Sequence, residues 1–450
     1  MAFPPVVLDT TLSDLFAEQH ERAVLAYCAT DDLPPILPSI PHSQKFIYSG
    51  LPLVEGDAVG LVLRCKGYPQ HLGFIAGNIP IYFLEYPETP AASLKTFCYE
   101  FERVYDALRE DQRPETHRIK HPSKLSLPEN AGIVTVRSQD SLAHLPSLVD
   151  PEVQYDLSSK RALAISGIPT PKTEIIDSIL SPDQVLDKDT IGKEVARLIS
   201  KAQVWEPPFI LKLQYSAASG GTFVVRSKED WDNCVCTVTD ELHLILRQLN
   251  RENHGFQPAS LLLQEFIPGE SIGISFFVTK EGTAIFLGAC GQLFGEDKLW
   301  IGASISYKEQ DRIYRENKSI LDCTARYAHA QGYFGPFGID VMRDKNGEPL
   351  VIDLNPRSTG ATPLCLLRQH LSVKRGLHEA TLLMPILLDV KWAEFTDVFR
   401  DELFSGQLIV TSWNQVPEKR YSVAGVVIAA ETKAGLQAGI LKVKTFNVNE

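Results

Sequence analysis

The spacing of hydrophobic residues predicts alternating helices and strands from about residue 156 onward. Apolar positions recur with a helical period over Ser158–Ser166, which Gly167 ends, and again over Asn317–Gln331. Ser227 followed by Asp230 predicts the capped start of another helix. Short apolar runs bounded by Pro, Gly or Ser predict the strands between these helices. The predicted strands are Phe209–Leu213, Thr222–Val225, Leu261–Ile267, Ile272–Val278 and Thr283–Gly288.

Residues 1–150 show a weaker version of the same pattern. Short apolar runs alternate there with proline-rich connections, Ala92–Leu108 predicts an amphipathic helix, and Gly132–Val136 predicts a strand. This mixture resembles a small α/β domain. At the other end of the chain, residues 386–450 contain one clear strand candidate, Val423–Ala430.

Composition and charge argue against several classes of function. The chain has 450 residues, 44% of them hydrophobic, and 44 Lys and Arg against 56 Asp and Glu give a net charge of −12. A nucleic-acid or anionic-membrane partner needs a basic face, so neither is expected. No apolar run reaches the roughly 18 residues that span a bilayer, and no secretory signal is visible. The eight cysteines are scattered, so we expect free thiols in the cytoplasm.

The segment 338–355, GIDVMRDKNGEPLVIDLN, predicts a hairpin with acidic residues on one face. Asn346-Gly347 favours a two-residue turn, which would place Asp340 directly opposite Asp353. Asn355 would share the face of Asp353, because side chains alternate along a strand. The opposite, core-facing positions would be Ile339, Val341, Ile352 and Leu354.

Two facing carboxylates roughly 5 Å apart repel each other unless a cation lies between them. Carboxylate and amide oxygens are ligands of Mg²⁺, so Asp340, Asp353 and Asn355 form a candidate metal site. Two alternatives remain open at this point. The hairpin could be an ordinary one with its carboxylates in solvent, or a three-residue loop with a bulge could offset the acidic pair by one residue.

A lysine inside an apolar strand and the small-residue loop after it suggest a phosphate site. Lys212 lies within FILKL, and the loop Ser216–Gly221 supplies Ser219, Gly220 and Gly221. Small residues let backbone N–H groups approach an anion closely. Upstream, Lys160 precedes the sequence GIPTP. The alternatives are an edge-strand lysine that points to solvent, a flexible turn and a surface lysine on a helix.

The segment QEFIPGE joins two predicted strands and could form a hinge that contacts a nucleobase. Backbone groups at a strand end can pair with the edge of an adenine while an apolar side chain covers its face. Glu270 could accept hydrogen bonds from ribose hydroxyls. The alternative is that the segment serves only as a structural connection. The candidate residues are Gln264, Glu265, Phe266, Ile267 and Glu270.

Taken in order, these four features resemble the ATP-grasp superfamily over roughly residues 155–370. The resemblance implies two α+β lobes that clasp ATP, preceded by a smaller α/β domain. It implies phosphate lysines at Lys160 and Lys212, and one or two Mg²⁺ ions, with Mn²⁺ as an alternative, at the metal site. It also implies a role for Arg357, in the NPR that ends the motif. Two departures are that family members often carry Glu where Asp340 and Asp353 stand, and that the ribose acid often lies one residue after Glu270.

The resemblance also divides the chain and points to an activity. Residues 1–150 would be a pre-ATP-grasp domain, 151–270 the nucleotide-binding lobe, 271–385 the metal-binding lobe and 386–450 an extension that completes this second lobe. The NPRSTG ending is similar to that of carboxylate–amine ligases, which form an amide through an acyl phosphate. Arg357 and Lys212 would be catalytic, and Gln292–Ser304 and Thr362–His370 are candidates for the second substrate.

The expected partners are therefore a small carboxylic acid and an amine, with a homodimer left open. Other functions compatible with the same motifs are a reaction with bicarbonate, simple phosphoryl transfer, or nucleotide binding without catalysis. Motifs for other nucleotide sites and hydrolases are missing from the sequence, including a P-loop, GxGxxG and GxSxG.

Overall fold

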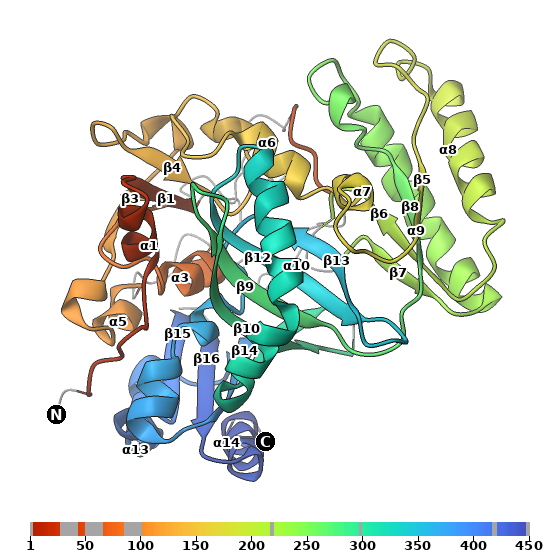
Figure 1. The fold of residues 1–450 in the computed structure, drawn as a ribbon. Coiled ribbons are helices and arrows are strands. Elements are labelled where there is room, and N and C mark those ends of the chain that lie inside the picture. The colour runs from red at the N-terminus through yellow and green to blue at the C-terminus, as the bar shows by residue number, and fades with distance from the viewer. Residues whose placement is uncertain are drawn as a thin grey trace.

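The computed structural model describes residues 3–27, 44–49, 66–84, 101–216, 220–296, 299–415 and 421–446. Within these ranges the chain forms three β-sheets with helices packed against them (Figure 1). One sheet is parallel and the other two are antiparallel. This architecture confirms the predicted mixed α and β class.

The N-terminal part contains a four-stranded parallel sheet in the order β3-β2-β1-β4. Its strands are β1 (Ala23–Tyr27), β2 (Pro80–Leu84), β3 (Glu115–Ile119) and β4 (Gly132–Val134). Its helices are α1 (Leu12–Glu18), α3 (Tyr68–Gly73) and α5 (Phe101–Asp106). The predicted strand at Gly132 is confirmed, and α5 lies inside the helix predicted over Ala92–Leu108, whose residues 92–100 fall outside the described ranges. A parallel sheet gathers the carboxyl ends of its strands at one edge, where binding residues often lie.

The middle lobe is built on an antiparallel sheet in the order β5-β8-β6-β7, with two long helices, α8 and α9. The elements are β5 (Thr173–Ile176), α8 (Lys188–Ala202), β6 (Phe209–Leu213), β7 (Thr222–Val225), α9 (Lys228–Arg247) and β8 (Leu261–Glu265). The predicted cap is confirmed, because the Ser227 side chain accepts from the Asp230 backbone N–H and the Asp230 carboxylate accepts from that of Ser227. Both helices contribute to the hydrophobic core that covers this sheet, through Leu198 and Leu246 among others.

The largest sheet has eight strands in the order β13-β12-β9-β10-β11-β14-β16-β15. The strands are β9 (Ile272–Val278), β10 (Ala284–Phe294), β11 (Trp300–Ser306), β12 (Gly335–Arg343), β13 (Pro349–Asn355), β14 (Glu379–Leu388), β15 (Leu408–Gln415) and β16 (Ser422–Ala430). The helices that accompany it are α10 (Gln310–Ala330), α11 (Thr362–Cys365), α12 (Trp392–Val398), α13 (Arg400–Ser405) and α14 (Lys433–Thr445). The boundary expected at residue 385 falls within β14, which pairs along its length with β16.

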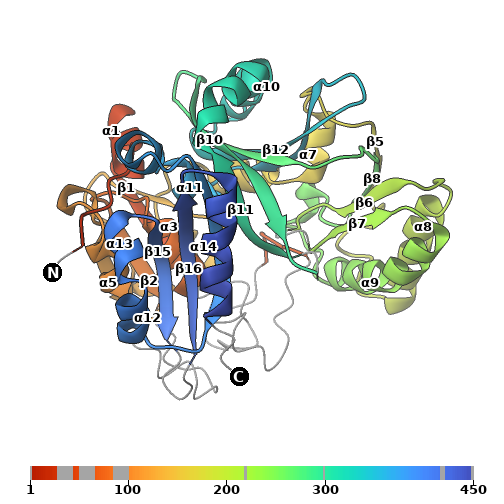
Figure 2. The same cartoon turned by 90° about the horizontal axis from the view of Figure 1, so that it is seen from below.

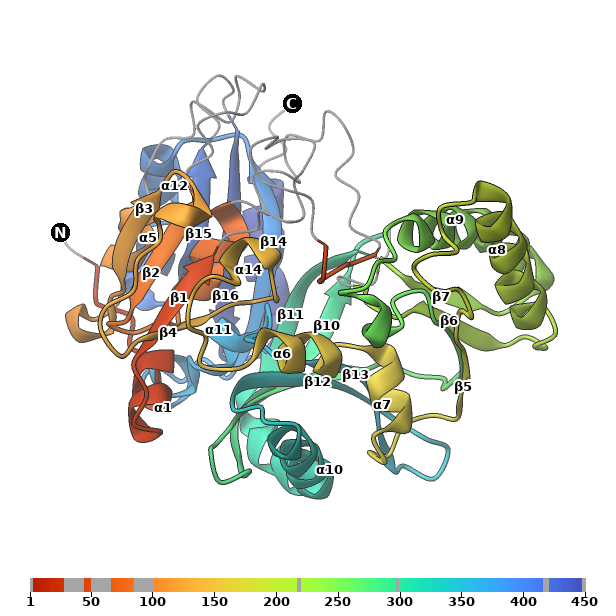
Figure 3. The ribbon, with the colours of Figure 1, turned by 90° about the horizontal axis from the view of Figure 1, so that it is seen from above.

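Two short helices connect the N-terminal part to the middle lobe. They are α6 (Pro151–Leu157) and α7 (Lys160–Ile165), and Figure 3 shows them between these two parts, close to β12 and β13. The side chain of Ser159 accepts a hydrogen bond from Ala162 and so begins α7 at Lys160. The predicted helix over Ser158–Ser166 therefore starts two residues later than expected, and its first turn carries Lys160 into the interior. No helix in the described ranges has the length and apolar character needed to cross a bilayer.

Candidate active site

The acidic hairpin of β12 and β13 places Asp340 opposite Asp353, as the sequence predicted. The predicted two-residue turn, however, is wrong. The backbone N–H of Asp344 donates to the carbonyl of Glu348, which closes a three-residue loop, and Gly347 there has a φ of +85°. A glycine suits this left-handed conformation because it has no side chain to clash with the backbone.

A bulge in β13 restores the register that the longer loop shifts. It leaves Ile352 without a partner between the paired positions on either side. Loop and bulge displace the pairing by one residue in opposite directions, so their effects cancel at Asp340 and Asp353. The prediction that Ile352 lies in the core is also wrong. Val351 is fully buried in its place, and Ile352 is partly exposed.

The two carboxylates have different neighbours. The Oδ1 atom of Asp340 accepts a 2.6 Å hydrogen bond from the Gln292 side chain on β10, whereas Asp353 forms a 2.9 Å ion pair with Lys160. Burial, and after it the negative charge of Asp353, raises the pKa of Asp340 to about 7. Oxygen ligands that repel one another in this way fit a divalent cation. Asn355, at the end of the same strand, adds an amide oxygen to this face.

Both predicted lysines are buried and reach from the middle lobe to β13. Lys160 is 7% exposed to solvent and Lys212 is 6% exposed, so neither is a surface lysine. Lys160 also donates to the carbonyl of Ser216 at 3.0 Å, while Lys212 donates to the carbonyl of Ile352 at 2.7 Å. Burial lowers the pKa of Lys212 to about 8, although Asp353 opposes this effect. The arrangement gathers two cations and two carboxylates where the middle lobe meets the acidic hairpin.

The small-residue loop starts and ends beside these lysines. The backbone N–H of Leu213 donates to the carbonyl of Gly221 at 2.8 Å, which closes the ends of the loop. A Cβ atom on Gly221 would lie 2.4 Å from that of Ser216, so this position needs glycine. Gly220 is described as well, whereas the predicted residue Ser219 lies outside the described ranges.

The predicted hinge follows β8, the strand next to β6. Glu265 pairs with Phe209, at the far end of the strand that carries Lys212. The buried side chain of Gln264 donates to the Thr173 hydroxyl at 3.0 Å and is thus used inside the lobe. Of the remaining candidates, Phe266 and Ile267 are partly exposed and Glu270 is exposed, with the guanidinium of Arg226 above the Phe266 ring. A role in nucleotide binding for these five residues stays a prediction.

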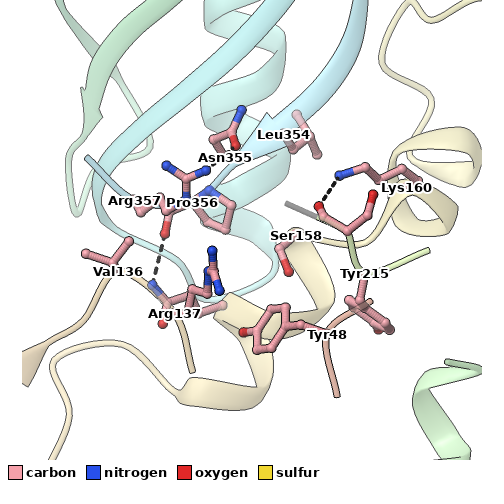
Figure 4. Close-up of a pocket in the computed structure, with 12 residues that line it drawn as sticks. Tyr48, Val136, Arg137, Ser158, Lys160, Tyr215, Leu354, Asn355, Pro356 and Arg357 are labelled. Carbon is pink, nitrogen blue, oxygen red and sulfur yellow. Dashed lines mark hydrogen bonds between the residues drawn. The ribbon is translucent and has the colours of Figure 1, made fainter. Parts of the chain in front are cut away.

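A pocket opens beside this cluster, and its lining includes residues that the sequence analysis missed (Figure 4). Arg357 lines it, as do Arg137 from the segment after β4 and Tyr48 from the N-terminal part. Arg357 donates to the Asn355 side chain at 2.9 Å. Burial, and after it repulsion by Arg137, lowers the pKa of Arg357. Two guanidinium groups close enough to repel each other favour an anionic ligand.

The pocket and the charged cluster share residues. Lys160, Ser216 and Asn355 line the pocket and also belong to, or adjoin, the cluster. The predicted segment Gln292–Ser304 reaches the same region: Gln292 contacts Asp340, and Figure 2 shows β10 and β11 extending toward the middle lobe. A ligand in the pocket would therefore lie next to a group held by the lysines and carboxylates.

A histidine of the N-terminal part holds the loop that follows β13. His71 is fully buried, and its Nε2 donates to the carbonyl of Gly360 at 2.7 Å. The Gly360 carbonyl can only accept, so the hydrogen of the neutral ring lies on Nε2. The other ring nitrogen, Nδ1, therefore accepts from the Thr411 hydroxyl on β15 at 2.8 Å. Burial lowers the pKa of His71 to about 4. The ring thus stays neutral at physiological pH and ties the loop with Arg357 to two other parts of the fold.

Replacing His71 with Gln is expected to remove part of the acid sensitivity of the fold. An unfolded histidine takes up a proton below about pH 6.5, whereas folded His71 does not until about pH 4, so stability falls as the pH drops through this window. The difference between the two pKa values corresponds to roughly 3 kcal/mol in the free energy of unfolding. Urea unfolding of the wild type and of His71→Gln, from pH 7 to pH 4.5, measures this loss of stability. The exposed His144→Gln variant serves as the control, and parallel curves for wild type and His71→Gln would contradict the assignment.

Comparison with known proteins identifies the region that carries this cluster. A family model described as "L-aspartate--L-methionine ligase, ATP grasp" matches residues 191–355. The match includes Lys212, the hinge and the complete acidic hairpin. Residues 191–355 of this chain are thus similar to an ATP-grasp family. This confirms the resemblance over the matched residues, which include Lys212, Asp340 and Asp353 of the cluster but not Lys160.

The curated relative of this chain is distant. The tyramine–L-glutamate ligase of Methanocaldococcus fervens is 28% identical over 102 residues, which make up 22% of this chain and 31% of that protein. The chain thus matches less than a third of the length of this curated relative.

Solved structures give similarities of fold at low identity. N5-carboxyaminoimidazole ribonucleotide synthetase from Thermus thermophilus is 12% identical with a TM-score of 0.48, covering 95% of this chain and 98% of that one. The L-amino acid ligase from Bacillus licheniformis is 12% identical with a TM-score of 0.48, covering 95% of this chain and 97% of that one. Phosphoribosylamine–glycine ligase from Thermotoga maritima is 13% identical with a TM-score of 0.49, covering 81% of this chain and 90% of that one. Similarities of this size say nothing about substrates.

Proposed function

We propose that the chain is an ATP-dependent ligase that joins a carboxylic acid to an amine through an acyl phosphate. The proposal rests on two neighbouring sites: the arginine pocket, lined by Arg137 and Arg357, and the lysine–carboxylate cluster of Lys160, Lys212, Asp340 and Asp353. Lys160 belongs to both sites, and Asn355 lines the pocket at the end of the strand that carries Asp353. A carboxylate held by Arg357 would lie beside a triphosphate held by the lysines. Bringing two anions together in this way is what formation of an acyl phosphate requires.

The residues of the acidic hairpin fit a magnesium ion. Asp340, Asp353 and Asn355 would hold it with oxygen atoms, and phosphate oxygens of the nucleotide would complete its coordination. When bound, such an ion neutralises the charge that develops on the transferred phosphoryl group. The part of the chain that the structure describes contains no group of three or more His, Cys, Asp or Glu residues suited to a metal. A site that shares its ligands with the nucleotide agrees with this finding.

The proposed reaction has two steps. An oxygen of the substrate carboxylate attacks the γ-phosphorus of ATP, the bond from that phosphorus to the β-bridging oxygen breaks, and ADP leaves. Lys160 and Lys212 would hold the phosphate oxygens, and the planar fork of Arg357 would orient the carboxylate. The amine nitrogen then attacks the acyl carbon, inorganic phosphate leaves with the electron pair of the carbon–oxygen bond, and the nitrogen loses a proton.

A second anionic group on the acid would account for the second arginine. Arg137 acts on Arg357 through its charge, and both line the same pocket. Two guanidinium groups can hold a reacting carboxylate and a further carboxylate of one molecule. The matched family and the curated relative are named for ligases of L-aspartate and L-glutamate. We therefore propose an acidic amino acid as the activated substrate.

A phosphate-release screen of acid and amine pairs tests the proposed function. Phosphate release that needs both an acid and an amine, together with an amide product detected by mass spectrometry, is the expected result. Release with the acid alone and no amide would indicate simple phosphoryl transfer. ATP binding without turnover across the panel would contradict the ligase and favour a non-catalytic nucleotide-binding protein.

Replacing Lys212 with Ala is expected to weaken ATP binding by about 30-fold. A buried hydrogen bond to a charged group contributes about 2 kcal/mol, and this substitution removes both the charge and the donor. Calorimetric titration with ATP and magnesium measures the change. The control is Lys201→Ala, an exposed lysine of α8 in the same lobe. Equal affinities of the Lys212 variant and the wild type would rule out the phosphate role.

A further inference from the structure

Gln154 on α6 lies between two hollows of the protein. One is the pocket of Arg137 and Arg357, and the other is a hollow beside β4, lined by Phe16 and Phe334 among others. Its position on α6 also places it between the N-terminal part and the loop after β13.

The carboxamide of Gln154 uses both of its donor hydrogens on backbone carbonyls. Its Nε2 atom donates to the carbonyl of Thr135 and to that of Pro356, each at 3.0 Å. Pro356 directly precedes Arg357, and Thr135 stands two residues before Arg137. One side chain therefore bonds to the two backbone segments that carry the pocket arginines.

The side-chain oxygen of Gln154 adds a further hydrogen bond to the segment that carries Arg137. The Oε1 atom accepts from the hydroxyl of Thr135 at 3.2 Å. The Ser138 hydroxyl lies 3.3 Å from Oε1, but its single hydrogen is directed at the Pro151 carbonyl of α6 at 2.6 Å. Gln154 thus holds the backbone before Arg137 through Thr135, and α6 holds the backbone after it through Ser138.

The charge of this group matters as much as its bonds. A carboxylate here would face two carbonyl oxygens without a hydrogen to donate, and would attract the guanidinium groups out of the pocket. A neutral carboxamide holds the segments of Arg137 and Arg357 together against their mutual repulsion without pairing with either guanidinium in a salt bridge.

We infer that Gln154 is a positioning residue that sets the separation of the Arg137 and Arg357 guanidinium groups, and thereby the fit of the acid. This inference rests on the proposed function, because it assigns the pocket to an acid. Gln154 also lines this pocket, but its polar atoms are bonded to the backbone segments that carry the two arginines. In this assignment it therefore acts on the acid through the arginines.

Gln154→Met tests this role, because Met keeps the length of the side chain and loses the hydrogen bonds to Thr135 and Pro356. With L-aspartate and L-glutamate as probe acids, the KM for the acid is expected to rise at least 10-fold. The KM for ATP should change less than 2-fold. A role in stability alone would not produce this split between the two substrates.

Gln310→Met is the matched control. Gln310 also donates to two backbone carbonyls, those of Ala289 and Ser306, each at 3.0 Å, and accepts from the N–H of Ala289 at 2.8 Å. It lies at the start of α10, away from the pocket. The two variants should lose similar thermal stability, and only Gln154→Met should change the KM for the acid. An unchanged KM in Gln154→Met, or an equal rise in both variants, overturns the inference.

Crystal structures of the wild type and Gln154→Met separate this inference from the proposed function. A shift of at least about 1 Å in the distance between the two guanidinium carbons supports the positioning role, and unchanged positions overturn it. This readout does not depend on turnover. If the wild type releases no phosphate with any acid, the proposed function fails, while the crystal structures still decide whether Gln154 positions the arginines.

Discussion

The Asp353→Asn variant should lose about 10³-fold of the ATP-dependent turnover and keep its fold. The substitution removes one of two facing carboxylates, and with it the charge that would hold a divalent ion against the triphosphate. It also removes the charge that pairs with Lys160 at 2.9 Å. Acid- and amine-dependent phosphate release measures the effect, and thermal unfolding checks the fold.

Asp344→Asn on the same hairpin is the control for Asp353→Asn. Asp344 accepts hydrogen bonds from the backbone N–H groups of Asn346 and Glu348, and an asparagine oxygen can accept them as well. This variant should therefore retain nearly full turnover. Turnover of Asp353→Asn within a few-fold of the wild type would refute the metal site as assigned.

Arg357→Lys is the second variant with a large expected effect, a fall of about 100-fold in kcat/KM for the acid. Lysine keeps the positive charge but cannot present two parallel N–H groups to a carboxylate or an acyl phosphate. It also loses the 2.9 Å hydrogen bond to Asn355. ATP affinity should stay within about 2-fold of the wild type, because the lysines hold the phosphates. Steady-state kinetics with varied acid and calorimetry with ATP separate the two effects.

Arg312→Lys provides a matched comparison for Arg357→Lys. Arg312 on α10 donates to Glu309 at 2.8 Å and to Glu316 at 2.7 Å at the surface, so the same change removes arginine hydrogen bonds outside the pocket. Exposed pairs contribute little to stability, and this variant should behave like the wild type. Similar kinetics for both variants would contradict the role of Arg357 in binding the acid.

The acidic pair could be predicted from sequence because it depends on local pairing across one hairpin. Its success also shows a limit of that reasoning. The favoured two-residue turn is one residue too short. The alternative, a three-residue loop with a bulge, is closer to the structure but implies an offset that does not occur, because the bulge at Ile352 cancels the shift and Asp340 still pairs with Asp353. Turn signals identify a hairpin well, but a bulge depends on contacts beyond the hairpin. Here the carbonyl of Ile352 accepts from Lys212 on another lobe.

Four residues that surround the site escaped the sequence analysis because they come from segments without a motif. Tyr48, His71, Arg137 and Gln154 belong to the N-terminal part or the helix after it, and they reach the site only through packing of separate sheets. A usable signal existed for Arg137 alone. It follows a strand of a predicted α/β domain, and the carboxyl ends of such strands are frequent binding positions.

The pairing of β14 with β16 has a consequence for any attempt to shorten the protein. A fragment that stops near residue 385 would strip β14 of its partner and leave a row of unsatisfied backbone groups beside apolar side chains such as Leu382 and Leu383. Such an unpaired edge strand can pair with other chains and so promotes aggregation. The residues that carry the motifs are therefore not expected to fold alone, and a fragment for expression should include β15 and β16.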